Sequence, residues 1–260
     1  MPAVKPGMIG VFGQTHIELD NLIDLKSFDD IQIDIWKGMA LSKFLSMQGS
    51  LSNIILDEDM SYKYYFKPLF KAYNEYQLLP LDDIVKVTGE ELRQTNRNSF
   101  VTFLKYAYGA HDLYTIYNFW NCKPGWKNNP SACLPNEILN YFPSLIQWIE
   151  NLITVNVFTH IGRAYIVALE SGGISFEHRD NLADPESQSD TEFIHIRPNL
   201  KRPFYVYNPV TNEKHYVQSR IAWWNDKDVH GGDSVTEPSY AIRIDGVFTD
   251  EFRNSILNEI

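Results

Sequence analysis

The sequence has few cysteines, no long apolar run and no excess of basic residues, and each of these absences excludes a class of protein. The two cysteines, Cys122 and Cys133, are too few for a disulfide framework. We interpret them as ordinary thiols, with a local disulfide or half of a metal site left open. No basic N-terminal stretch precedes an apolar run, and no apolar run approaches the length of a membrane span. We therefore expect a cytoplasmic protein with no membrane partner.

The charge balance argues against a protein whose main task is to hold nucleic acid. The chain has 23 Lys and Arg against 33 Asp and Glu, a formal net charge of −10. Binding to phosphates draws on clustered basic residues, so a nucleic-acid partner is not favoured, although a local basic groove stays open. The oligomeric state is left open as well.

The 260 residues are enough for one large domain or two small ones, and 44% of them are hydrophobic. From about residue 153 the apolar residues recur with a period of two, which indicates strands separated by turns. We expect strands at 154–158, 164–169, 174–178, 193–197, 204–208, 215–217, 220–224 and 241–247. This pattern predicts a mainly β region, either a sandwich or a jelly roll, over residues 153–260.

Residues 1–152 mix helical and strand patterns and are expected to buttress the β region as part of one compact domain. We expect strands at 8–12 and 31–36, helices at 39–47, 62–76 and 90–107, a long loop at 118–134 and an amphipathic helix within 135–155. The predicted fold class is therefore mainly β, with additional α-helices.

Two histidines and one aspartate form the candidate site with the most chemistry. His178 and Asp180 are two residues apart on a predicted strand end, so their side chains lie on the same face. His230 follows about fifty residues later, just before two glycines read as a turn. Two imidazoles and one carboxylate are typical of a site that holds non-heme Fe(II) and leaves positions open. Zinc could be held by the same residues.

Arg243 is the second candidate, because it lies in an alternating strand, where an inward-facing guanidinium needs a partner. A carboxylate would match its forked geometry. A salt-bridged or strand-edge arginine is the plain alternative.

Several ordered features between residues 155 and 250 resemble the Fe(II)/2-oxoglutarate-dependent dioxygenases. The nearest branch is the aspartyl/asparaginyl β-hydroxylase-like and proline-hydroxylase-like group. An Arg-led strand from Arg163, a Leu-x-x-Gly turn at 169–172 and the His178-x-Asp180 pair come in the order seen there. The strand around His195, the Trp-Trp-Asn segment at 223–225, His230 and Arg243 then follow. The sequence departs from the group at Phe193, where an arginine would stand. Residues 1–152 resemble no family that we can name.

The resemblance implies a double-stranded β-helix core, that is, a cupin-like jelly roll, and a catalytic role for three residues. His178, Asp180 and His230 would bind Fe(II), and O2 and 2-oxoglutarate would be co-substrates. Arg243 would pair with the far carboxylate of 2-oxoglutarate, helped by His195, with Arg197 as a substitute for the arginine missing at 193.

The substrate implied is an amino acid or a peptidyl amino-acid side chain, which would be hydroxylated with release of succinate and CO2. Arg163, Trp223, Asn225 and the loops 120–133 and 181–191 are the candidate substrate determinants. The same chemistry on a nucleobase or another small metabolite is an alternative. A second alternative is a non-catalytic jelly-roll binding module.

Overall fold

The structure is a computed structural model that describes residues 3–49, 114–122, 133–173, 175–178 and 192–260. At several strand ends, His178 among them, the description covers the main chain only. The predicted helices 62–76 and 90–107 and the loop 181–191 lie outside the described residues, as does most of the loop 118–134.

Two antiparallel sheets form the centre of the described structure. The larger has seven strands in the order β1-β11-β8-β13-β6-β3-β2, and the smaller has four in the order β10-β9-β12-β7. The larger sheet comprises β1 (His16–Glu18), β11 (Ile221–Trp224), β8 (Glu192–Ile196), β13 (Ser239–Phe248), β6 (Phe158–Leu169), β3 (Tyr114–Asn118) and β2 (Met47–Gly49). The smaller comprises β10 (Glu213–Tyr216), β9 (Tyr205–Asn208), β12 (Val229–Gly232) and β7 (Ser175–His178). A separate pair joins β4 (Trp120–Cys122) to β5 (Cys133–Pro135).

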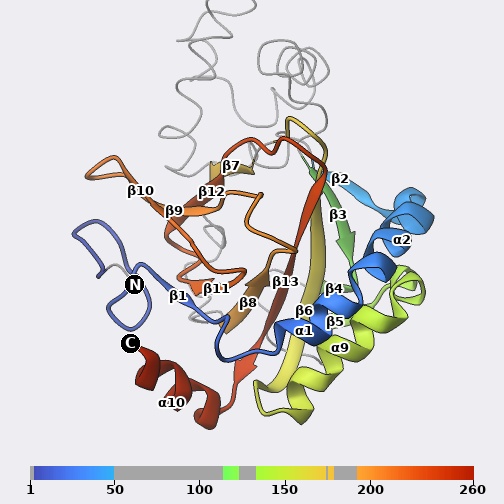
Figure 1. Cartoon of the computed structure of the whole chain (residues 1–260), viewed down its shortest axis with the longest axis horizontal. Coiled ribbons are helices and arrows are strands. Elements are labelled where there is room, and N and C mark those ends of the chain that lie inside the picture. Colours follow the sequence, from blue (N-terminus) through green and yellow to red (C-terminus); the bar gives the residue numbers. More distant parts are fainter. Residues whose placement is uncertain (1–2, 50–113, 123–132, 174, 179–191) are drawn as a thin grey trace, which may run out of the picture.

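The chain alternates between the two sheets as it runs from β6 to β13. It passes from β6 to β7 in the smaller sheet, returns for β8, crosses again for β9 and β10, and repeats this for β11, β12 and β13. Figure 1 shows the two sheets and the strands that alternate between them. This connectivity fits a jelly roll, in which strands far apart in sequence lie side by side.

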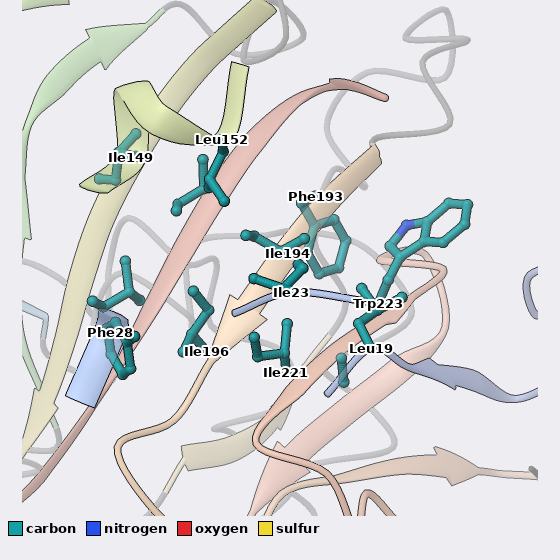
Figure 2. Packing of buried hydrophobic residues seen from close by; sticks show 14 of the residues in the cluster. Leu19, Ile23, Phe28, Ile149, Leu152, Phe193, Ile194, Ile196, Ile221 and Trp223 are labelled. Atoms are coloured by element: carbon teal, nitrogen blue, oxygen red, sulfur yellow. The ribbon is translucent and has the colours of Figure 1, made fainter. Parts of the chain in front are cut away.

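Helices cover one face of the larger sheet. They are α1 (Leu25–Asp30), α2 (Gln32–Ser42) and α9 (Pro143–Thr154), accompanied by the 3-10 turns η1 (Lys43–Leu45) and η3 (Glu137–Tyr141), while α10 (Asp250–Glu259) ends the chain. Figure 2 shows Ile149 and Leu152 of α9 in the same cluster as Ile194 and Ile196 of β8. The apolar stripe of α9 and every second residue of β8 thus belong to one core, because strand side chains alternate between the two faces.

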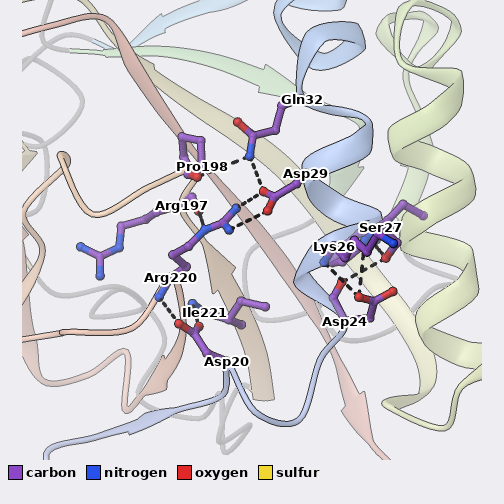
Figure 3. Close-up of polar contacts among 11 residues, drawn as sticks. Asp20, Asp24, Lys26, Ser27, Asp29, Gln32, Arg197, Pro198, Arg220 and Ile221 are labelled. Carbon is purple, nitrogen blue, oxygen red and sulfur yellow. Dashed lines mark hydrogen bonds and ion pairs between the residues drawn. The ribbon is translucent and has the colours of Figure 1, made fainter.

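Polar contacts join α1 to the sheet beneath it. Asp24 caps α1 by accepting a hydrogen bond from the amide of Lys26, and Asp29 near its end accepts from Arg220 at 3.1 Å. Figure 3 shows Arg220 between Asp29 of α1 and the backbone of Arg197, which follows β8.

The alternating patterns predicted several strands of both sheets. The expectations at 193–197, 204–208, 220–224 and 241–247 correspond to β8, β9, β11 and β13, and that at 164–169 falls within β6. The described part of residues 1–152 contributes strands to the larger sheet itself, namely β1, β2 and β3. None of the helices in the described ranges is long and apolar enough to cross a membrane.

Four expectations were wrong. Residues 31–36 form the start of α2 rather than a strand: the alternating isoleucines suggested period two, but Ile35 is buried while Ile33 is exposed on a helix. Residues 154–158 are the end of α9, a turn and the first residue of β6. Gly231 and Gly232 belong to β12 rather than to a turn. Residues 8–12 form a bridge at Val11 rather than a strand.

Candidate functional site

The faces of β8 and β13 that turn away from the helices carry polar and aromatic side chains. Arg243 is the register partner of His195 on one side and of Tyr165 on the other, and Asp245 is the partner of Phe193. These side chains share one face of the sheet, since directly paired residues of antiparallel strands point the same way. This face is turned toward the smaller sheet, as contacts between Trp224 of β11 and His230 of β12 demonstrate.

His178 and His230 are direct register partners on β7 and β12. Residues that face each other in an antiparallel pair have side chains on the same face and only about 5 Å between their Cβ atoms. The two histidines predicted as metal ligands are therefore brought together by the sheet, although fifty-one positions separate their backbones in the sequence.

The hydrogen bonding of His230 fixes its tautomer. Its side chain is buried, and its Nδ1 lies 2.9 Å from the backbone oxygen of Asp228. A carbonyl can only accept, so Nδ1 carries the proton and Nε2 carries the lone pair. Metal-binding histidines usually have this arrangement, with the second ring nitrogen donating to a carbonyl or a carboxylate.

The third expected ligand, Asp180, lies outside the described residues, as does the side chain of His178. Within the described ranges, no group of three or more His, Cys, Asp and Glu side chains is arranged to hold a metal ion. The ligand set His178, Asp180 and His230 therefore stays a prediction, and the paired backbone positions and the His230 tautomer are compatible with it.

Aromatic rings enclose the two histidines of the inner face. The ring of Trp224 lies 5.1 Å from His195 and 5.2 Å from His230, and Phe204 stacks at 4.9 Å on His195. The Nε1 of Trp224 is buried and has no hydrogen-bond partner among the described residues. A buried donor of this kind is costly to leave unsatisfied, which suits a site where a ligand enters.

His195 is neutral at the centre of this face. Burial lowers its pKa well below the usual value, and the positive charges of Arg202, Arg197 and Arg243 act in the same direction. A neutral imidazole offers one donor and one acceptor. The positive charges around His195 therefore favour the binding of an anion there over the binding of a further cation.

Arg243 is engaged by two carboxylates. Its Nε donates to Asp245 at 2.7 Å and a terminal nitrogen donates to Asp226 at 2.8 Å, while its guanidinium lies 3.8 Å from the ring centre of Phe193. Arg163 donates to the other oxygen of Asp245 at 2.9 Å. Phe193, which stands where the resemblance expects an arginine, thus forms the surface on which Arg243 is stacked.

Arg197 is bound to main-chain oxygens. It donates to the carbonyl of Arg202 at 2.7 Å, to that of Val217 at 2.9 Å and to that of Ser219. Burial lowers the pKa of Arg197 to about 10, so it is charged at neutral pH. In Figure 3 its side chain extends away from Arg220.

Arg202, which the sequence reasoning missed, is the other buried arginine near His195. It donates to the carbonyl oxygen of Val167 at 2.7 Å and to the hydroxyl of Ser175 at 3.2 Å. Lys201 beside it is exposed and paired with Glu237, and no sequence signal distinguishes which of the two basic neighbours is buried.

The candidate substrate residues lie in different places. Arg163 is on the inner face, half-buried, with its guanidinium 4.5 Å from the ring centre of Tyr165. Trp223 points to the opposite side of the sheet and packs on Phe248. Asn225 caps the turn before β12 by accepting from the amide of Lys227. Only Arg163 of these three shares the face of His195.

Two solved structures show weak overall similarity. An oxidoreductase of the 2OG-Fe(II) oxygenase family from Burkholderia pseudomallei aligns over 60% of this chain and 86% of its own, with a TM-score of 0.35 and 11% identity. A viral collagen prolyl hydroxylase from Paramecium Bursaria Chlorella virus-1, in complex with 2OG, aligns over 51% and 79%, with a TM-score of 0.26 and 9% identity. No family profile and no curated protein matches the sequence. Likeness at this level assigns the chain to no family.

Proposed function

We propose that the protein is an Fe(II)- and 2-oxoglutarate-dependent dioxygenase with a double-stranded β-helix core. The observation that carries the proposal is the direct pairing of His178 with His230 across β7 and β12, inside a two-sheet fold whose inner face is polar. The His178-x-Asp180 motif and the ordered resemblance around it supply the third ligand and the reaction class.

His178, Asp180 and His230 are the residues that would hold the iron. With O2 and 2-oxoglutarate, the bound metal supplies the oxidation of a C–H bond to an alcohol, while 2-oxoglutarate becomes succinate and CO2. The chain's own part begins at His230, whose Nδ1–H bond to the carbonyl of Asp228 presents Nε2 to the ion. Trp224 and Phe204 line the same space with apolar rings and so restrict water.

The electrostatics of the inner face suit a dianionic co-substrate. Arg197, Arg202 and Arg243 surround a neutral His195. A dicarboxylate entering this space meets positive charge at short range, where the low dielectric strengthens the attraction. Arg243 is the co-substrate residue that the resemblance implies, with His195 as its helper.

The substrate that we propose is an amino acid or an amino-acid side chain in a peptide. Support comes from the branch that the motif order resembles and from the acidic net charge, which does not favour a nucleic-acid partner. Arg163 lies on the inner face with one side in contact with solvent, and it is the candidate contact for the substrate.

The experiment is a succinate-release assay with Fe(II), ascorbate and 2-oxoglutarate, run against free amino acids, peptides and nucleosides. We expect release that is stimulated by an amino acid or peptide and abolished in His230→Ala. The matched control is His160→Ala, which removes a half-buried histidine at the far end of β6. Stimulation by nucleosides alone would show that the substrate is a nucleoside rather than an amino acid or peptide. Succinate release that persists in His230→Ala would contradict the proposed metal site.

A further inference from the structure

We propose that Arg202, rather than Arg243, binds the far carboxylate of 2-oxoglutarate, and that Arg243 is a positioning residue held by ion pairs with two buried carboxylates. This inference rests on the proposed function and changes which residue recognises the co-substrate. It assigns a binding role to a residue in the loop between β8 and β9, where no motif pointed.

Among the described side chains in contact with Arg243, the positive and negative charges are equal in number. Arg163 and Arg243 contribute two cations, and Asp226 and Asp245 contribute two anions, with Asp245 shared between both arginines. Three of these four side chains are almost wholly buried. A ligand carboxylate at Arg243 would have to compete with two buried carboxylates, one of which would then lose its partner at a cost of several kcal/mol.

Arg202 has the opposite environment. Its side chain is buried and forms no ion pair with a carboxylate in the described ranges. The guanidinium donates hydrogen bonds to one carbonyl and one hydroxyl. A buried guanidinium without a counter-charge is unfavourable unless an anion binds there. Burial and the neighbouring Arg197 lower the pKa of Arg202 to about 9, which still leaves it charged at neutral pH.

The loop that carries Arg202 is fixed on two sides. Arg197 donates to the carbonyl of Arg202 itself. On the other side the loop lies against β12: a Cβ placed on Gly232 would come within 2.5 Å of the carbonyl oxygen of Pro203. The guanidinium is therefore held in place before a ligand arrives, which lowers the entropic cost of binding.

Arg202 lies near His195, as does the predicted ligand His230. Its partner Ser175 begins β7 and His178 ends it, so the two are about 10 Å apart along the strand. Among the neighbouring charges that lower the pKa of His195, that of Arg202 has the largest effect, and His230 acts in the same direction. We infer that a five-carbon dicarboxylate bound through its keto acid end at the predicted ligands would direct its far carboxylate toward this guanidinium.

Binding can be measured without turnover on the Mn(II)-loaded protein by calorimetry. The two probes are 2-oxoglutarate and 2-oxopentanoate, which keeps the keto acid but has a methyl group in place of the far carboxylate. Wild type should prefer 2-oxoglutarate. Arg202→Met should weaken 2-oxoglutarate binding roughly 10–100-fold, as expected for loss of hydrogen bonds to a charged group, and leave 2-oxopentanoate unchanged.

Arg243→Met and Arg202→Lys are the comparison variants. Arg243→Met should retain most of the preference for 2-oxoglutarate, and Arg202→Lys should recover part of the affinity, with circular dichroism showing that both are folded. The inference is overturned if Arg202→Met keeps the preference, or if Arg243→Met loses it while Arg202→Met does not. In either case unchanged Mn(II) affinity leaves the proposed function standing. Wild-type protein that binds neither Mn(II) nor Fe(II) overturns both.

Discussion

The ion-pair network around Arg243 makes a specific prediction about stability. Asp226→Asn keeps the shape of the side chain but removes one of the two carboxylates that face this guanidinium. Arg243 is 4% exposed and Asp226 2% exposed, so solvent does not replace the lost charge. Breaking a buried pair costs about 3–5 kcal/mol, and we expect about 3 kcal/mol because Asp245 remains. For a chain of this size, that corresponds to a fall in Tm of roughly 6–12 °C.

The assay is thermal and urea unfolding followed by circular dichroism, with an exposed ion pair as the control. Lys201 and Glu237 lie 2.9 Å apart with both side chains largely in solvent, so Glu237→Gln should cost less than about 1 kcal/mol. Adding Arg243→Met to Asp226→Asn should restore part of the stability, since it removes the uncompensated cation. The reasoning is refuted if Asp226→Asn is no more destabilising than Glu237→Gln.

Three further predictions concern pH, packing and the N-terminal segment. Burial lowers the pKa of His16 from 6.5 to about 4, so the unfolded chain binds a proton at this residue before the folded chain does. The free energy of unfolding should therefore fall as the pH drops from 6.5 to 4, by about 3 kcal/mol at pH 4. Urea unfolding at a series of pH values should show this loss, and His16→Phe should reduce the pH dependence. Gly232→Ala should displace Pro203 and so lower both the Tm and the affinity for 2-oxoglutarate measured by calorimetry. An unchanged affinity would show that the loop carrying Arg202 does not take part in binding 2-oxoglutarate. Asp228→Ala removes the acceptor of two amides at residues 9–10, so limited proteolysis should cut the N-terminal segment faster than in wild type; equal rates would show that other contacts hold it.

Strand alternation made much of the β region predictable. In β8 and β13 the isoleucines that face the helices alternate with residues of the inner face, so period two is visible in the sequence. The same reasoning failed at α2, where Ile31, Ile33 and Ile35 alternate by chance. Helical packing there is decided by contacts with η3, including the close approach of Gly38 to Tyr141, which no local pattern encodes.

Only those residues of the candidate site that belong to a recognisable sequence motif could be predicted. His178, Asp180 and His230 stand out by residue type and order, and the sheet register pairs the two histidines. The network of Asp226 with Arg243 and the burial of Arg202 depend on long-range contacts. A single sequence does not distinguish a buried arginine from an exposed one, because burial is set by strands distant along the chain.

The most direct test of the proposed function is an anaerobic titration of the protein with Fe(II) and 2-oxoglutarate, followed by visible absorption. Chelation of ferrous iron by the keto acid produces a charge-transfer band that needs neither O2 nor a known substrate. We predict that the band forms in wild-type protein with one equivalent of iron and is lost in His230→Ala, while His160→Ala retains it. Absence of the band and of any Fe(II) binding in wild-type protein would contradict the assignment.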